Sequence, residues 1–218
     1  MQALGHIAIN VEEQNVDLLS ASAHKFYGPK GVGLLYCRKS VRLPNLIEGG
    51  AQERGRRGGT ENVPGIAAMA AALRECRDNM ETENARVAKL RDKLTAGILR
   101  IPETRINGSL AHRLPGNVNA CFAGIEGESL LISLDLAGIC ASSGSACTSG
   151  SLDPSHVLLA IGLPHEIAHG SLRLSLGREN TEEEVDYVLE QLPVIVNRLR
   201  DMSPVWERMC KEKSFLER

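Results

Sequence analysis

The sequence predicts an α/β fold, and three observations favour it. Apolar runs of strand length alternate with longer stretches in which apolar residues recur every three or four positions. Glycine- and proline-containing turns separate several of these segments. Hydrophobic residues make up 43% of the chain and charged residues 24%, which is typical of a globular protein. A chain of 218 residues has room for one large domain or two small ones.

Two strands are predicted near the start of the chain. Residues 16–25, VDLLSASAHK, form an apolar run that ends in small residues, as expected of a buried strand. Residues 31–39, GVGLLYCRK, form the second strand, after a turn that contains Gly28 and Pro29. The first residues enter this pattern at once, so we expect the sequence to begin inside a domain.

A long helical pattern follows a Gly- and Arg-rich loop at residues 48–65. Apolar residues keep helical spacing from Ile66 to Cys76 and again from Val87 to Ile98. The spacing predicts a single long helix, or two helices interrupted near Asn79, that links two domains. We therefore expect one domain over residues 1–75 and another over residues 76–218.

The second half alternates predicted strands with predicted helices. Strands are expected at residues 104–109, 116–124, 139–145 and 169–177, and helices at 127–138, 153–162 and 181–202. The helix at 153–162 is expected to have Asp153 as its N-cap and Pro154 in its first position. The last helix opens with a Thr181/Glu184 capping box and contains Pro193, where we expect a kink.

Composition and charge exclude several classes of partner and site. The net charge of −2 gives no reason to expect nucleic acid or an anionic membrane as a partner. No apolar run approaches the ~20 residues of a membrane-spanning helix, and no secretory signal is expected. The six cysteines show no C-x-x-C pair, which argues against a disulfide framework and a zinc site. We expect a cytoplasmic protein with free thiols and no metal.

One cysteine lies in unusual surroundings. Cys147 lies in SSGSACTSGS, residues 142–151, where serine, threonine and glycine predict a polar loop. A cysteine used for packing is normally surrounded by apolar residues, whereas a reactive thiol must be accessible. Cys147 is therefore a candidate nucleophile.

A lysine lies where a predicted strand meets a Gly-rich turn. Ligand sites of α/β proteins gather at strand ends, and a lysine held there can form a Schiff base. Ser22 and His24 flank Lys25 and could donate hydrogen bonds to a phosphate. The alternative is an ordinary surface lysine in a turn.

Two arginine-containing segments also have two interpretations each. The loop ERGRRGGTEN, residues 53–62, offers backbone N–H groups and a threonine hydroxyl to a phosphate, or is simply a solvated basic loop. Arg173 shares one face of its predicted strand with Ser175 and Gly177. It is suited to hold a carboxylate bidentately, or to form a structural ion pair.

Four of these segments together resemble one family. SASAHKFYGPKG, GGAQERGRRGGTEN, SSGSACTSGSLDPSHVLLAIG and SLRLSLGRENTEEEVDY occur in the order and spacing of the pyridoxal-phosphate-dependent cysteine desulfurases of the NifS/IscS kind. The resemblance covers nearly the whole chain. It implies the C-terminal part of a fold-type I pyridoxal-phosphate-dependent transferase. Residues 1–75 would be the end of the large domain, and residues 76–218 the small domain.

The resemblance implies a role for each candidate residue. Lys25 matches the lysine that binds pyridoxal phosphate covalently, and Arg173 matches the residue that holds the substrate carboxylate. Cys147 matches the nucleophile. Ser22 and His24 match residues that bind the cofactor's phosphate, and Gln2 matches a glutamine near its phenolic oxygen. Thr60 matches a residue that one subunit of a dimer supplies to the phosphate bound by the other.

The activity that the resemblance implies is removal of sulfur from L-cysteine, which yields L-alanine and a persulfide on Cys147. The sulfur would pass to an iron–sulfur scaffold or another acceptor protein, and the enzyme would be a homodimer. Family members are about twice as long, and their N-terminal half supplies a histidine and an aspartate for the pyridine ring. The alternatives are therefore one half of a split enzyme, a fragment, or a non-catalytic module that docks an acceptor. A selenocysteine lyase is less favoured by the SSGSACTSG segment.

Overall fold

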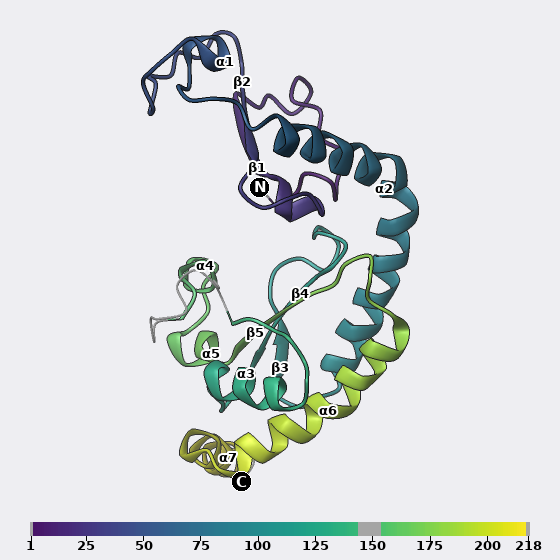
Figure 1. Cartoon of the computed structure of the whole chain (residues 1–218). Helices are drawn as coiled ribbons and strands as arrows, with labels where there is room; N and C mark the ends of the chain where they lie inside the picture. Colours follow the sequence, from purple (N-terminus) through teal and green to yellow (C-terminus); the bar gives the residue numbers. More distant parts are fainter. Residues whose placement is uncertain (1, 144–153, 217–218) are drawn as a thin grey trace. The chain divides into compact units, whose positions relative to one another are not determined.

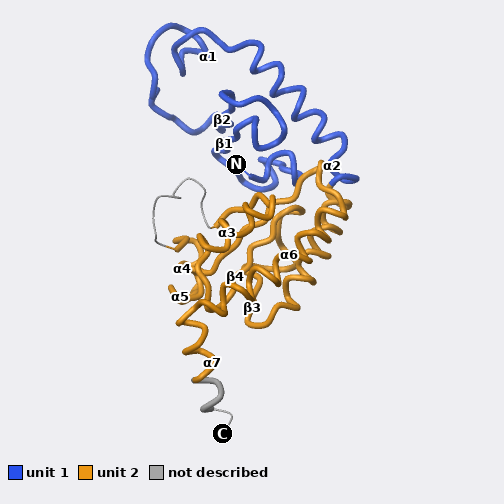
Figure 2. Tube along the Cα trace, turned by 60° about the horizontal axis from the view of Figure 1, so that its bottom comes forward, with its two compact units in different colours: residues 1–83 blue, residues 84–218 orange. Residues whose placement is uncertain are grey.

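The computed structural model describes residues 2–143 and 154–216 of the chain (Figure 1). The chain divides into two compact units, residues 1–83 and 84–218 (Figure 2). The division falls inside helix α2 (Val63–Ile98), the helix in which the sequence also predicts a domain boundary. None of the helices in the described part of the chain combines the length and apolar character needed to cross a membrane.

The first unit is built on a two-stranded antiparallel sheet. Strand β1 (Leu18–Ser22) pairs with β2 (Gly33–Cys37), and the register runs from Leu18 opposite Cys37 to Ser22 opposite Gly33. A short 3-10 helix, η1 (Ala23–Phe26), follows β1 directly. The four-residue helix α1 (Gln52–Gly55) lies in the loop before α2.

The face of this sheet that points toward α2 carries the core of the unit. Ala21 and Phe26 are buried together with Met69 of α2, and Leu19 and Leu34 pack against them. The opposite face is open, and Leu18 and Leu35 are 45% and 58% exposed. A strand is confirmed within residues 16–25, but it ends at Ser22, since Ala23–Phe26 form η1. It is buried on one face only, because this unit supplies one covering helix.

The second unit has a three-stranded antiparallel sheet of order β3-β4-β5. The strands are β3 (Thr104–Ile106), β4 (Asn117–Phe122) and β5 (Ser171–Ser175). Alternate residues such as Val118, Phe122 and Leu172 join a core with helices α3 (Gly127–Leu136) and α6 (Glu182–Asp201) and with the end of α2. The α/β class is confirmed, although α5 was not predicted.

Two short helices pack near the other face of this sheet. Leu158 of α4 (His156–Ala160) and Ala168 of α5 (His165–His169) are buried in a small cluster with Cys121 of β4. Helix α7 (Pro204–Leu216) follows α6 and was not predicted.

The helix ends differ from prediction in one place and agree in another. Helix α4 begins at His156 with Ser155 in the N-cap position, two residues later than expected, and Asp153 lies outside the described residues. Helix α6 has the predicted capping box: Glu184 N–H donates to Thr181 Oγ1, and Thr181 N–H donates to the Glu184 carboxylate. The helix runs through Pro193 without interruption.

Two further expectations are resolved by the helix and strand bounds. Helix α2 is one helix of 36 residues and is not interrupted near Asn79. The strand expected at residues 139–145 is wrong for the described part of that range. There only a single bridge, between Ser142 and Arg173, joins the segment to β5.

Candidate functional site

The junction of β1 and η1 brings three candidate residues together. Ser22 is the last residue of β1, and His24 and Lys25 lie in η1. Lys25 and Ser22 are half-buried, whereas His24 is exposed. The structure thus places Lys25 in the short helix that directly follows the strand, three residues beyond its last residue.

The backbone around Lys25 forms a tight turn. Gly28 N–H donates to Ala23 O at 2.9 Å, and Tyr27 between them has a left-handed backbone with a φ of 65°. Gly28 allows this closure, because a Cβ there would lie 2.8 Å from the Cβ of Ala23. Phe26, which is fully buried, anchors the turn in the core of the first unit. The lysine therefore projects from a fixed backbone.

Gln2 and Thr60 lie on separate loops of the first unit, and both are exposed. The loop that carries Thr60 contains two non-glycine residues with left-handed backbone, Glu53 and Arg54, at φ values of 49° and 59°. Such residues cost free energy and recur at functional sites. The Asn45 side chain donates to Gly55 O at 2.7 Å and Gly58 N–H donates to Ile47 O at 3.0 Å, so the loop is held at two points.

Arg173 lies in the middle of β5, in the second unit. It is half-buried and stands opposite Asn119 of β4 in the register. Because residues that face each other across antiparallel strands point to the same side, Arg173 and Asn119 share the face away from the main core. Ser175 is on the predicted face, but β5 ends there, so Gly177 lies beyond the strand.

A chain of polar contacts continues from Asn119, and the sequence did not predict it. The Asn107 side-chain amide donates to Asn119 Oδ1 at 2.6 Å and to Cys121 Sγ at 3.1 Å. Asn107 is 6% exposed and Cys121 is 1% exposed. Asn119 and Cys121 are two positions apart in β4, and this spacing is the signal in the sequence that their side chains share a face.

Cys121 is unsuited to act as a nucleophile. Its burial raises the pKa of the thiol, an effect larger than the opposing hydrogen bond from Asn107. A thiol of raised pKa stays protonated and unreactive near neutral pH.

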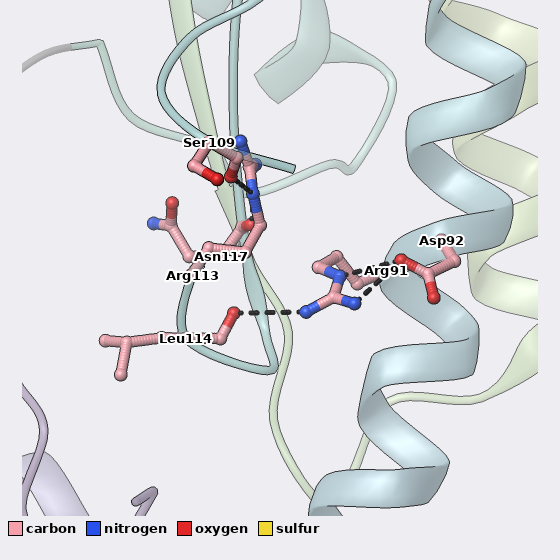
Figure 3. Close-up of polar contacts among 6 residues, drawn as sticks. All are labelled: Arg91, Asp92, Ser109, Arg113, Leu114 and Asn117. Atoms are coloured by element: carbon pink, nitrogen blue, oxygen red, sulfur yellow. Dashed lines mark hydrogen bonds and ion pairs between the residues drawn. The ribbon is translucent and has the colours of Figure 1, made fainter. Parts of the chain in front are cut away.

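The loop before β4 is held by two arginines (Figure 3). Arg113 donates to Ser109 O at 2.8 Å, Asn107 O at 2.8 Å and Asn117 O at 3.3 Å. Arg91 of α2 donates to Leu114 O at 3.5 Å. Burial, followed by the charge of Arg91, lowers the pKa of Arg113. These contacts hold residues 107–117 in place. They therefore also hold the Asn107 side chain where it donates to Asn119.

Cys147 lies outside the described residues, but the segments on either side of it are anchored in the second unit. Before it, Ser142 N–H donates to Arg173 O at 3.1 Å and Arg173 N–H donates to Ser142 O at 2.5 Å. After it, Leu158 of α4 is buried against Cys121. The chain thus enters this stretch next to the strand that carries Arg173.

The chemistry of the side chains in the first unit fits pyridoxal phosphate. The Lys25 amine suits the cofactor's carbonyl carbon, and the Ser22 hydroxyl and His24 imidazole suit phosphate oxygens. Among residues 2–143 and 154–216, no group of three or more His, Cys, Asp or Glu side chains is placed to hold a metal ion.

Comparison with known proteins identifies the family. The profile of the family Aminotransferase class-V matches residues 1–188. The cysteine desulfurase IscS of Clostridium botulinum strain Hall is 58% identical over 98% of this chain and 54% of that protein.

Two solved structures are similar as well. A NifS-like protein matches 91% of this chain and 51% of its own, with a TM-score of 0.81 and 40% identity. SspA in complex with cysteine matches 83% of this chain and 49% of its own, with a TM-score of 0.62 and 32% identity. The chain spans about half the length of these proteins. The match over residues 1–188, at this identity and with this structural likeness, shows that the chain belongs to the class-V aminotransferase family.

Proposed function

We propose that this chain carries the lysine, arginine and cysteine of a cysteine desulfurase that converts L-cysteine to L-alanine and leaves the sulfur as a persulfide on Cys147. The observation that carries the proposal is the position of Lys25. It projects from a rigid turn at a strand end beside Ser22 and His24, in a chain 58% identical to a cysteine desulfurase.

Pyridoxal phosphate, when bound, supplies an electron sink for the carbanion formed at the substrate's α-carbon. Lys25 Nζ would hold the cofactor covalently, and the same amine would move the α-proton of the substrate. Ser22 and His24 would donate hydrogen bonds to its phosphate, and Gln2 would donate to its phenolic oxygen. Thr60 contacts the phosphate bound by a second copy of the chain in a homodimer.

Arg173 and Cys147 act on the substrate. The Arg173 guanidinium pairs with the α-carboxylate through two parallel N–H bonds, which fixes the amino acid's orientation. The Cys147 thiolate attacks the substrate sulfur, so that an S–S bond forms as the C–S bond breaks. A proton delivered to the β-carbon and the return of the α-proton to the α-carbon complete L-alanine. The persulfide sulfur then passes to an iron–sulfur scaffold or another acceptor in the cytoplasm.

A second candidate function is a non-catalytic module whose second unit, which is compact in itself, docks an acceptor protein. The two candidates differ in whether the chain binds the cofactor when the rest of the fold is supplied.

The test joins this chain in frame to the N-terminal half of the Clostridium botulinum relative. We expect a visible cofactor absorbance band, alanine release from L-cysteine, and a persulfide mapped to Cys147 by mass spectrometry. Lys25→Ala should abolish the band, whereas Cys147→Ala should keep the band and stop alanine release. Cys210→Ala is the matched control and should behave as the parent. No band in the joined protein would favour the docking module.

A further inference from the structure

We propose that His6 and Cys76 are positioning residues that hold the turn of Lys25, an inference that rests on the proposed function of that lysine. Neither residue was predicted to belong to the site. His6 comes from the segment before β1, and Cys76 comes from helix α2. Both lie in the first unit, and both reach the backbone of η1.

Two backbone carbonyl groups at the end of η1, those of Lys25 and Phe26, support this role. The last carbonyls of a helical turn have no partner within it and need one from elsewhere. His6 Nε2 lies 3.2 Å from Lys25 O, and the Cys76 thiol donates to Phe26 O at 3.3 Å. Two consecutive carbonyls, of the lysine itself and of the residue after it, are therefore bound by side chains from two other segments.

These contacts fix the direction in which Lys25 projects. Rotation of the peptide planes on its C-terminal side would break the contact with His6 or with Cys76. Phe26, fully buried between them, resists the same motion. The ring of His6 also meets Tyr27 edge-on, with centroids 6.3 Å apart. A lysine that must reach one carbon atom gains reactivity from such a fixed origin.

The approach of His6 depends on Gly5. A Cβ at Gly5 would lie 2.7 Å from the Cβ of Phe26, and its φ of 85° favours glycine. The adjacent turn is closed by hydrogen bonds from His6 N–H and Ile7 N–H to Ala3 O at 3.0 Å. This segment is thus shaped to bring the imidazole to the lysine turn.

The first experiment measures opening of the turn in the chain itself, by native-state trypsin cleavage after Lys25. His6→Phe keeps a ring but removes the donor, and His6→Gln restores a donor of similar reach. Cys76→Ala and Cys76→Ser form the corresponding pair. We expect cleavage after Lys25, relative to cleavage after Lys39, to rise about 3- to 10-fold in His6→Phe and Cys76→Ala, and to return toward the parent in the other two.

Two matched controls show whether loss of any histidine or thiol has this effect. His112→Phe changes an exposed histidine of the second unit. Cys37→Ala removes a thiol that contacts Arg38 O and Val41 O, away from the turn. Both should leave the cleavage ratio unchanged. Equal ratios in the parent and in both donor-free variants would overturn the proposal.

The second experiment separates positioning from stability, in the protein joined to the N-terminal half of its relative. After brief exposure to pyridoxal phosphate and reduction with borohydride, the label on Lys25 is compared with that on Lys30. We expect His6→Phe to lower this ratio several-fold and His6→Gln to restore it. An unchanged ratio beside increased trypsin cleavage would mean a structural role only and would refute positioning. If the parent shows no label on Lys25, the proposed function fails, and the cleavage comparison alone decides whether the turn is held.

Discussion

The two compact units differ greatly in how many apolar side chains they bury. In the described part of the chain, the core of the second unit has seventeen buried side chains, drawn from the sheet, α2, α3 and α6. The core of the first unit has four. A two-stranded sheet is only marginally stable on its own, whereas three strands covered by helices can be stable independently.

The lightly buried unit is also the one that holds the candidate lysine. Leu35 is 58% exposed and Leu46 is 96% exposed, so much of the apolar surface in the first unit is not covered by this chain. The order of the Lys25 turn then depends on a few specific contacts rather than on a large core. The anchors of Arg173 and of the segments around Cys147 lie in the well-packed unit instead.

The largest expected effect tests whether the two units unfold separately. Phe122→Ala should destabilise the second unit by about 3–5 kcal/mol, because a fully buried aromatic side chain is removed from its core. Met69→Ala, in the small core, should leave the transition of the second unit unchanged. Denaturant unfolding followed by hydrogen exchange of each unit measures both. If Met69→Ala shifts the transition of the second unit as much as Phe122→Ala does, the chain unfolds as one body. That result would contradict separate unfolding of the two units.

A smaller effect is expected at Arg113 (Figure 3). Arg113→Ala should lower the free energy of unfolding of the second unit by about 1–3 kcal/mol, because three carbonyl groups lose their donor. Arg113→Lys keeps the charge but cannot reach all three carbonyls, so it should recover little of the loss. Full recovery by lysine, measured by urea unfolding, would show that charge matters rather than the forked geometry.

The buried thiol of Cys121 predicts a pH dependence that is specific to the second unit. Burial raises its pKa, so the folded state retains a proton that the unfolded state loses above about pH 8.5. The stabilisation is complete below that pH and is lost as pH rises toward the folded pKa. The slope approaches at most about −1.4 kcal/mol per pH unit. Unfolding free energies between pH 7 and pH 10 measure it, and Cys121→Ala should show a shallower slope than the parent.

The smallest expected effect concerns the start of α6. Thr181→Ala removes the hydroxyl that accepts from Glu184 N–H and should cost about 1 kcal/mol. Thr181→Ser keeps the acceptor and serves as the control. Thermal unfolding should place the serine variant near the parent. An alanine variant as stable as the parent would mean that the cap adds nothing to the second unit.

Local patterns in the sequence predicted most of this architecture. Apolar spacing predicted α2, α3 and the five strands, and the Thr181/Glu184 pair predicted the start of α6. Helix α7 was missed, although Val205, Trp206, Met209 and Cys210 have helical spacing. It is attached through Trp206, whose ring lies 4.1 Å from the guanidinium carbon of the buried Arg200. Such a contact between separate helices leaves no periodic signal in the sequence.

In the candidate site, too, local patterns were predictable from the sequence, whereas contacts between distant segments were not. The position of Lys25 follows from a strand that runs into a glycine turn, and the face of Arg173 follows from strand alternation. The contacts of His6 and Cys76 join residues 19 and 50 positions away along the chain, and no local pattern indicates them. The link from Asn107 to Asn119 depends on strand pairing, which the sequence did not specify.

The bridge between Ser142 and Arg173 has a consequence for how this protein can change in evolution. Both of its hydrogen bonds join main-chain atoms, so side-chain substitution at position 142 leaves them intact. Beyond the cysteine, Leu158 is buried in a cluster with Cys121 of β4 and Ala168 of α5. We therefore expect the stretch between these two anchors, which carries Cys147, to tolerate changes of length and sequence while the strand that presents Arg173 stays the same.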